Sequence, residues 1–338
     1  MMMTKSIDAL TKEFEKKFGS DAMLTGEDRL PQQGTIPCIP SRIPTLDYAL
    51  GIGGLPRGRI IEVFGLEGSG KTLIIGLFIA EAQRQNGLGA IVDAEHALHP
   101  ELMRLAGVDW ATLRVLLPKN GEEGLEMAES LVASNLFDVV GVDSVASLVS
   151  QKEIDGDYND VHMAPLARLM SQGLRKLAPI IGESNSILIF NNQIRQRPGV
   201  SFGSPDYQPG GKALPFYSSV RLHVSTGDKF KDANKQQIGH RIKVLVKKSK
   251  VAAPHFTAAF NLYYRDGFHE GYGEVEKGVD VGEAYMTFAE SQGLLLNSGS
   301  WFALAHPETG EELGKWSGRY KTSTAIMEFQ ELLDGLIY

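Results

Sequence analysis

The residues best suited to chemistry form one stretch, GLEGSGKT, between Gly65 and Thr72. Its spacing matches the phosphate-binding pattern G-x-x-x-x-G-K-[ST], and it lies between an apolar strand and a helical stretch, as that pattern requires. Glycines let backbone N–H groups turn toward a phosphate, Lys71 neutralises phosphate oxygens, and Thr72 places a hydroxyl on Mg²⁺. The stretch predicts a site for a nucleoside triphosphate with magnesium. Its members are Gly65, Leu66, Glu67, Gly68, Ser69, Gly70, Lys71 and Thr72.

Polar residues also follow three other apolar strands. Asp143 ends the strand 139–143, where a carboxylate can hold the magnesium shell. An isolated Asp at a strand end is more often a turn former, but the phosphate loop favours the metal role. Glu95 follows the preceding strand and is suited to orient and deprotonate the water that attacks the γ-phosphate. Asn192 and Gln193 end the next strand, where an amide can donate to a phosphate oxygen and accept from water.

Gln193 leads into residues 194–212, which contain three prolines, four glycines and no periodicity. A loop of this length inside a compact domain is usually functional or disordered. Its basic and aromatic side chains are suited to nucleic-acid phosphates and bases, although a mobile surface loop explains the composition equally well. They are Arg195, Arg197, Phe202, Tyr207 and Lys212. Residues 153–163 carry four acids, so composition there argues against DNA binding.

The elements that must position these residues alternate between short apolar strands and helical stretches. This alternation predicts an α/β fold with a parallel sheet covered by helices on both faces. Three later strands, two of them with partial alternation, suit an antiparallel extension. The first set is 60–64, 71–85, 90–93, 121–134, 139–143, 163–178 and 187–191, and the later strands are 220–224, 242–246 and 256–264.

Outside this core, apolar residues at helical spacing predict an amphipathic helix over 5–18, whose apolar stripe needs a partner. Residues 20–40, with several Gly and Pro, suit a linker. After about residue 270 we expect a small mixed lobe. The predicted domains are a helix with its linker (1–33), a nucleotide-binding core (34–269) and a C-terminal lobe (270–338).

The 338 residues carry a formal net charge of −7, so DNA binding would need local concentrations of positive charge. One lies between Lys229 and Lys250, with eight Lys or Arg and one acid, although such a run is more often a solvated face. Cys38 is the only cysteine, which excludes an intrachain disulfide and a cysteine-based zinc site. Neither a membrane span nor a signal peptide is evident, so we expect a cytoplasmic location without a membrane partner.

Longer stretches carry a more specific signal. The segments LDYALGIGGLPRGRIIEVFG, VDAEHAL, VDSVASL, MSQGLRKLA, LIFNNQIR, FGSPDYQPGGKAL and FYSSVRL occur in this order. Together they closely resemble the bacterial and phage RecA recombinase family over most of the chain. The resemblance implies a RecA-like P-loop ATPase core, an N-terminal docking helix and a small C-terminal α+β lobe. It also implies ATP and Mg²⁺, single- and double-stranded DNA as partners, and a helical homo-oligomer active in strand exchange, repair and the SOS response.

The resemblance also implies roles by matched position. Those at the nucleotide are Lys71, Thr72, Asp143, the base Glu95 and a γ-phosphate sensor, Gln193. Lys248 and Lys250 fall where a neighbouring protomer reaches across to the phosphates. Both loops, 153–163 and 194–212, are implied to face DNA, which overrules the charge argument against the first. The implied DNA contacts are Met163, Ser171, Arg175, Arg195, Arg197, Phe202, Gly210 and Gly211, and the subunit-interface positions are Phe216 and Arg221.

The sequence departs from the family at His99 and Leu102, which stand where an Asp and a Tyr usually hold adenine. Pro198 replaces an expected apolar wedge, and because the sequence ends Leu336-Ile337-Tyr338 we expect no acidic tail of the kind typical of many relatives. Two alternatives stay open: a hexameric helicase or branch-migration factor with the same core, and a non-catalytic filament protein that binds ATP and DNA. The single cysteine and the docking helix argue against the first, and intact catalytic residues against the second. A self-cleaving repressor as partner, and a bacterial or phage origin, are also left open.

Overall fold

The computed structural model describes residues 6–20, 22–23, 36–156, 165–196, 206–269 and 272–338. The chain divides into two units, Met1–Ile36 and Pro37–Tyr338, which we describe separately. Within the described ranges, no helix is long and apolar enough to cross a membrane.

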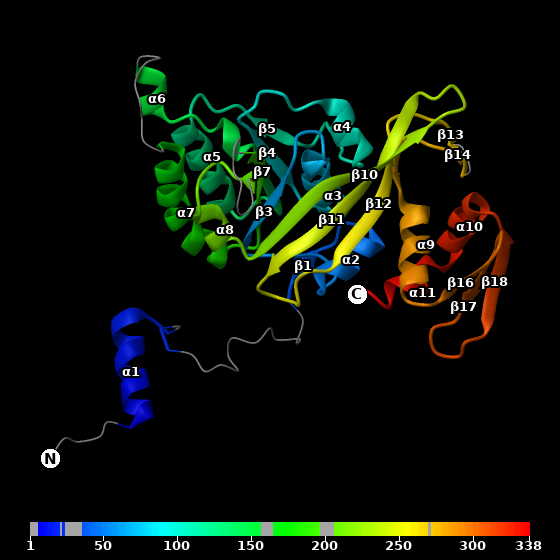
Figure 1. Ribbon diagram of the computed structural model, residues 1–338. Helices are drawn as coiled ribbons and strands as arrows, with labels where there is room; N and C mark the ends of the chain where they lie inside the picture. The colour runs from blue at the N-terminus through cyan, green and yellow to red at the C-terminus, as the bar shows by residue number, and fades with distance from the viewer. Residues whose placement is uncertain (1–5, 21, 24–35, 157–164, 197–205, 270–271) are drawn as a thin grey trace. The chain divides into compact units, whose positions relative to one another are not determined.

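A nine-stranded sheet runs through the larger unit in the order β15-β12-β11-β10-β3-β7-β6-β4-β5 (Figure 1). Strands β10, β3, β7, β6, β4 and β5 are mutually parallel, and β11, β12 and β15 extend the sheet in antiparallel fashion. This arrangement confirms the predicted α/β class. In chain order the strands are β3 (Arg59–Gly65), β4 (Gly89–Asp93), β5 (Arg114–Leu116), β6 (Val139–Asp143), β7 (Ile187–Gln193), β10 (Val220–Lys231), β11 (Gln237–Ser249), β12 (Thr257–Tyr263) and β15 (Gly278–Asp280).

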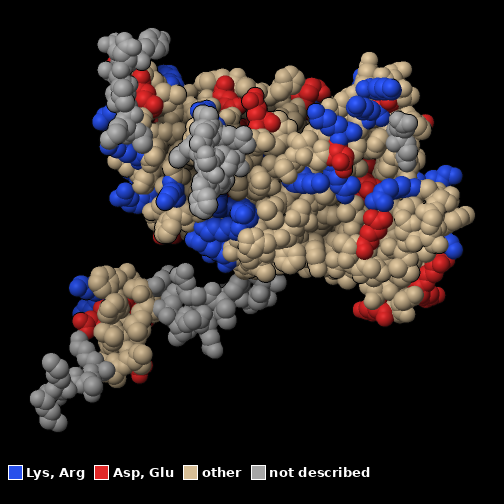
Figure 2. Space-filling view, viewed as in Figure 1, with Lys and Arg blue, Asp and Glu red and all other residues tan. Residues whose placement is uncertain are grey.

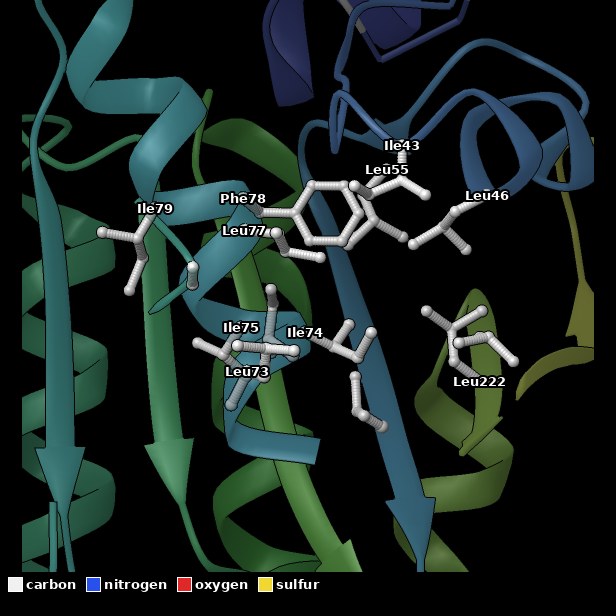
Figure 3. Packing of buried hydrophobic residues seen from close by; sticks show 14 of the residues in the cluster. Ile43, Leu46, Leu55, Leu73, Ile74, Ile75, Leu77, Phe78, Ile79 and Leu222 are labelled. Carbon is white, nitrogen blue, oxygen red and sulfur yellow. The ribbon is translucent and has the colours of Figure 1, made fainter. Parts of the chain in front are cut away.

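Helices cover both faces of this sheet, and the apolar side chains of its strands alternate between the two faces. Along β7, Ile189 lies in the hydrophobic cluster that contains helix α3 (Lys71–Arg84), whereas Leu188 and Phe190 lie in the cluster that contains α5 (Gly121–Ala133) and α7 (Pro165–Glu183). Figure 3 shows Phe78 of α3 among side chains of the first cluster. Each such side chain, when buried, stabilises the fold by about 1.5–3 kcal/mol.

The bounds of two predicted local structures differ from those observed. The β10–β11 hairpin extends well beyond the predicted strands 220–224 and 242–246, because backbone pairing continues, with bulges, through a polar stretch that has no apolar pattern to reveal it. Within the predicted linker 20–40, Cys38–Ile39 forms strand β1, which pairs with β2 (Leu55–Pro56), and Ile39 is fully buried. The neighbouring prolines concealed this strand because they are typical of loops.

The smaller unit contains one described helix, α1 (Ile7–Phe18), close to the predicted 5–18. It begins where the Ser6 hydroxyl accepts a hydrogen bond from the Ala9 N–H, and it ends at Gly19, whose φ is 102°. The smaller unit by itself buries none of the helix residues, and Ile7, Phe14 and Phe18 are exposed. Nothing within the smaller unit therefore covers the apolar stripe, and the prediction that it needs a partner stays a prediction.

The remaining elements support the core or form a C-terminal cluster. Helix α9 packs against β12 and against α2, and the Arg319 guanidinium pairs with the carboxylates of Glu283 and Glu290. These elements are α2 (Pro44–Leu50), α4 (Pro100–Leu105), η2 (Val145–Ser147), α6 (Gln151–Asp155), β8 (Arg195–Gln196), β9 (Asp206–Tyr207), α8 (Ala213–Tyr217), β13 (Gly267–His269), β14 (Gly273–Val275), α9 (Val281–Ser291), β16 (Leu295–Ser298), β17 (Trp301–Ala305), β18 (Glu312–Ser317), α10 (Arg319–Ala325), η3 (Ile326–Phe329) and α11 (Gln330–Asp334).

Asp47 of α2 ties the C-terminal residues to the core. Its buried carboxylate accepts hydrogen bonds from the Ser41 N–H (2.7 Å) and hydroxyl (2.8 Å), and from the Tyr338 hydroxyl (2.7 Å). Burial raises the pKa of Asp47 to about 7, although these hydrogen bonds oppose the rise.

We expect Asp47→Asn to gain stability relative to the wild type as pH rises from 5 to 7. A carboxyl whose pKa is higher in the folded state contributes stability at low pH and loses it as pH rises through about 7, on the order of 1 kcal/mol per pH unit. Asparagine does not ionise. Urea unfolding at several pH values measures the difference, with exposed Asp228→Asn as the control. A difference that does not vary with pH would contradict the prediction.

Candidate nucleotide and DNA site

The phosphate-binding stretch connects β3 to α3, as its sequence context predicts. Gly68 and Gly70 have φ of 70° and 96°, a left-handed backbone that favours glycine. Gly65 has no space for a side chain, because a Cβ there would lie 2.1 Å from the Val224 carbonyl oxygen. Residues 66–68 are exposed, whereas Ser69 is buried. The loop therefore presents its backbone at the carboxyl edge of the sheet.

Two side chains of this loop are suited to phosphate. The Lys71 ammonium donates to the Leu66 carbonyl (2.9 Å), and burial lowers its pKa against the attraction of Asp143, Glu95 and Glu67. Among the described residues, the buried Ser69 hydroxyl has no hydrogen-bond partner. An unpaired buried hydroxyl is costly, so a phosphate oxygen would suit it. The residues present thus fit a nucleotide phosphate.

Asp143 and Thr72 meet beside the loop, as the metal prediction requires. The Thr72 hydroxyl donates to Asp143 Oδ2 (2.6 Å), and burial raises the pKa of Asp143 to about 6. The Asn191 amide also donates to Asp143 Oδ1 (2.5 Å), a contact that the sequence analysis missed. No group of three or more His, Cys, Asp or Glu suited to a metal occurs in the described part of the chain. Mg²⁺ does not require one, because it is commonly held by one or two protein oxygens, water and substrate phosphates.

Glu95 lies at the same edge, beyond the end of β4. Its Oε1 accepts hydrogen bonds from the Ser144 hydroxyl and from the Gln193 amide, the latter at 3.2 Å. The backbone N–H groups of Ala94 and Glu95 both donate to the Asp143 carbonyl (2.7 and 3.2 Å), which fixes this turn against β6. The structure thus brings together Glu95, Gln193, Asp143 and the phosphate loop.

Asn192 does not join this group. Its amide donates to the buried carboxylate of Glu62 (3.1 Å) and to the Pro209 carbonyl (3.2 Å). Side chains of a strand alternate between the two faces of the sheet, so Asn191 and Gln193 lie on one face and Asn192 lies on the other. The same alternation, applied to the sequence, could have singled out Asn191 from its spacing with Gln193.

Arg221 completes the Asn192 network within the chain. Its guanidinium donates to Glu62 Oε2 (2.5 Å) and to Gln208 Oε1 (2.8 Å), and it lies 4.6 Å from the centre of the Phe64 ring. Gln208 and Pro209 belong to the 194–212 segment. The predicted interface role of Arg221 stays a prediction, whereas these contacts connect β3, β7 and β10 to that segment.

Four of the described positions predicted to face DNA, namely Ser171, Arg175, Gly210 and Gly211, lie on or beside α7. Ser171 and Arg175 line a hollow of about 350 Å³ on that helix. Gly210 and Gly211 have φ of 83° and 74°, and a Cβ on Gly211 would lie 3.1 Å from Ala167 of the same helix. Arg195 is exposed in β8, which pairs with β9. Met163, Arg197, Pro198 and Phe202 lie outside the described residues, as does much of both predicted loops.

Basic residues lie at both ends of the β10–β11 hairpin. Lys229, Lys231 and Lys235 are exposed near its tip, where Figure 2 shows a gathering of Lys and Arg. At the opposite end, the Lys248 ammonium donates to the carbonyls of Pro215 (2.7 Å) and Phe216 (3.1 Å) in α8. Burial, Lys250 and Arg221 lower the pKa of Lys248.

Two other residues predicted to lie at a subunit interface have exposed side chains. The Phe216 side chain is 73% exposed and Lys250 is also exposed, so both are available to a neighbouring subunit.

Of the two positions that depart from the residues expected to hold adenine, His99 is the N-cap of α4 and Leu102 lies within that helix. The His99 imidazole accepts the Glu101 N–H (3.2 Å) and caps the helix, and the side chain of Leu102 packs partly against the core. The histidine ring is therefore held at the helix start, while Leu102 offers no aromatic face to a base.

Known proteins are similar to this chain over nearly its whole length. The profile of the RecA N-terminal domain matches residues 5–269. Protein RecA of Macrococcus caseolyticus (strain JCSC5402) is 43% identical over 330 residues, 98% of this chain and 88% of that protein. Protein RecA of Clostridium tetani (strain Massachusetts / E88) is 42% identical over 97% of this chain and 88% of that protein. Protein RecA of Francisella tularensis subsp. novicida (strain U112) is 44% identical over 96% of this chain and 87% of that protein. The chain therefore belongs to the RecA family of recombinases, which act in DNA recombination and repair.

Proposed function

We propose that this protein is a DNA-stimulated ATPase that assembles with ATP and Mg²⁺ as a helical filament on single-stranded DNA. The filament pairs that strand with homologous double-stranded DNA and exchanges strands. The observation that best supports coupling is the hydrogen bond between the Gln193 amide and Glu95, because Gln193 immediately precedes the 194–212 segment. A γ-phosphate that competes for this amide would change the position of the segment's first residues.

The Gly65 carbonyl supplies a second connection, since it accepts the Ile194 N–H (3.0 Å). The phosphate loop and the start of the predicted DNA loop are therefore bonded through the backbone, in addition to the contact of the Gln193 side chain with Glu95. Both contacts favour a protein in which the nucleotide controls the DNA-facing segment.

ATP hydrolysis measured with and without single-stranded DNA, alongside a strand-exchange assay, tests the proposal. We expect DNA to stimulate turnover and exchange to require ATP. A ring-shaped helicase would unwind duplexes without exchanging homologous strands, and a non-catalytic filament protein would show no turnover. Stimulation of a repressor's self-cleavage belongs to the same proposal and is tested by incubating the repressor with the filament.

The exposed stripe of α1 supports a subunit-docking role for that helix. We expect Phe14→Asp to shift the protein toward smaller species in sedimentation velocity with ATP and Mg²⁺, because a charge would replace apolar surface buried on assembly. Lys16→Asp is the matched control, since Lys16 lies opposite Phe14 on the helix. Equal sedimentation of Phe14→Asp and wild type would argue against docking through this stripe.

The residues at positions 99 and 102 support weak selectivity for adenine. An aromatic stack contributes about 0.5–1.5 kcal/mol beyond area burial, so a leucine in its place should cost several-fold in affinity. We therefore expect a small preference for ATP over GTP and a several-fold gain in ATP affinity in Leu102→Tyr. Titrations of ATP and GTP against the wild type and against Leu102→Tyr measure these affinities. A strong ATP preference in the wild type with no gain from tyrosine would show that other residues hold the base.

A further inference from the structure

Asn191 holds a central place in the nucleotide site. It lies on β7 between β3 and β6, one residue before Asn192, and its side chain is 3% exposed. The adjacent Phe190 belongs to the cluster under α5 and α7, so Asn191 faces the side of the sheet that α3 covers. Thr72 lies in the first turn of that helix.

The Asn191 amide group contacts both residues predicted to hold magnesium. Its Nδ2 donates to Asp143 Oδ1 (2.5 Å) and to the Thr72 hydroxyl oxygen (3.3 Å), and Thr72 in turn donates to Asp143 Oδ2 (2.6 Å). The three side chains form a closed triangle of hydrogen bonds. Each carboxylate oxygen of Asp143 therefore has its own donor, which fixes the orientation of the carboxylate.

The other end of the carboxamide offers an unused acceptor. A carboxylate only accepts hydrogen bonds, so the NH₂ group of Asn191 must face Asp143 and Oδ1 must point elsewhere. Among the described residues this buried oxygen has no hydrogen-bond partner. Oδ1 shares one carbon with Nδ2, so it lies close to Thr72 and Asp143. A hydrated Mg²⁺ carries water molecules that are strong donors, and such an oxygen suits them.

We propose that Asn191 is a positioning residue for magnesium: its NH₂ group orients Asp143 and Thr72, and its oxygen accepts from the metal's water shell. This inference rests on the proposed function, since it concerns the same ATP–Mg²⁺ site. It assigns Asn191 no contact with the phosphates. Loss of the amide therefore weakens the binding of Mg²⁺ at the site, so that more Mg²⁺ is needed to enhance nucleotide binding. It does not weaken nucleotide binding in the absence of Mg²⁺.

The test compares two buried asparagines on strands of the same sheet. Asn191→Leu removes the amide group at the site, and Asn261→Leu removes an amide group from β12. The Oδ1 atom of Asn261, like that of Asn191, lacks a hydrogen-bond partner among the described residues. A fluorescent ATP analogue is titrated against the full-length proteins in EDTA and then at increasing Mg²⁺. Thermal unfolding without Mg²⁺ checks that each variant is folded, and Asn191→Ala replaces the leucine variant if that one does not fold.

We expect Asn191→Leu to raise the Mg²⁺ concentration for half-maximal enhancement of binding by about 10-fold or more, the range typical of residues that orient metal ligands. Binding in EDTA should change less than about twofold, and Asn261→Leu should change neither quantity. An unchanged Mg²⁺ requirement in a folded Asn191 variant overturns the inference, as does an equal loss of binding with and without Mg²⁺. A wild type that does not bind the analogue would instead contradict the proposed function.

Discussion

Glu95→Gln is expected to bind ATP and single-stranded DNA but to lose ATP turnover by a factor of at least about 10². A general base must accept a proton from the attacking water, and glutamine cannot do so at neutral pH. In the structure Glu95 Oε1 already accepts from Ser144 and Gln193, so one carboxylate oxygen is oriented by the protein while the side chain remains exposed. Steady-state hydrolysis with saturating DNA measures the loss.

Binding measurements separate catalysis from folding in this variant. Glutamine is nearly isosteric with glutamate, and its oxygen can still accept from Ser144, so nucleotide and DNA affinities should change little. Ser144→Ala should lower turnover less than Glu95→Gln does, because it removes an orienting hydrogen bond and leaves the carboxylate in place. Wild-type turnover in Glu95→Gln would remove Glu95 from the mechanism.

The double variant Lys248→Ala/Lys250→Ala is expected to lose DNA-stimulated hydrolysis by at least about 10², since cations that stabilise transition-state charge contribute on this scale. Within one chain Lys248 is bonded to the carbonyls of Pro215 and Phe216, and Lys250 is exposed. Within the described part of the chain, neither lysine forms a hydrogen bond or ion pair with its own phosphate loop, which favours action on a neighbouring subunit's nucleotide. Lys247→Ala, an exposed charge on the same strand, is the matched control.

Mixing experiments test whether these lysines act across the interface. Lys71→Ala protein keeps its Lys248 and Lys250, and the double lysine variant keeps an intact phosphate loop. A mixture can therefore form composite sites that contain every catalytic group, and it should recover part of the lost turnover. If the double variant alone hydrolyses ATP normally with DNA present, the assignment in trans fails. If the mixture recovers nothing although both variants assemble on DNA, the lysines act within their own chain.

The sequence by itself determined the class of the core and most of the nucleotide site. Buried residues recur with one period in helices and another in strands, so the sequence reveals the strand–helix alternation. Parallel strands end at the same edge of a sheet, so the sequence alone places Lys71, Thr72, Asp143 and Glu95 together. Short motifs of this kind are local, since glycine conformation and the helix start depend on neighbouring residues. The strand 38–39 and the length of the β10–β11 hairpin were missed because their pairing partners lie far along the chain or carry no apolar pattern.

Only the tertiary structure decided which polar side chains at a strand end work together. Asn191, Asn192 and Gln193 are consecutive and chemically similar, yet the first contacts Asp143, the second Glu62 and the third Glu95. Likewise, the sequence predicted Arg221 for a subunit interface and Lys248 for a neighbour's phosphates, but within the chain folding places acceptors beside them, the buried Glu62 for one and the α8 carbonyls for the other. A hydrogen bond depends on the distance and direction between two residues, such as Arg221 and Glu62, that lie more than a hundred positions apart. Composition, motif and periodicity carry no information about that distance.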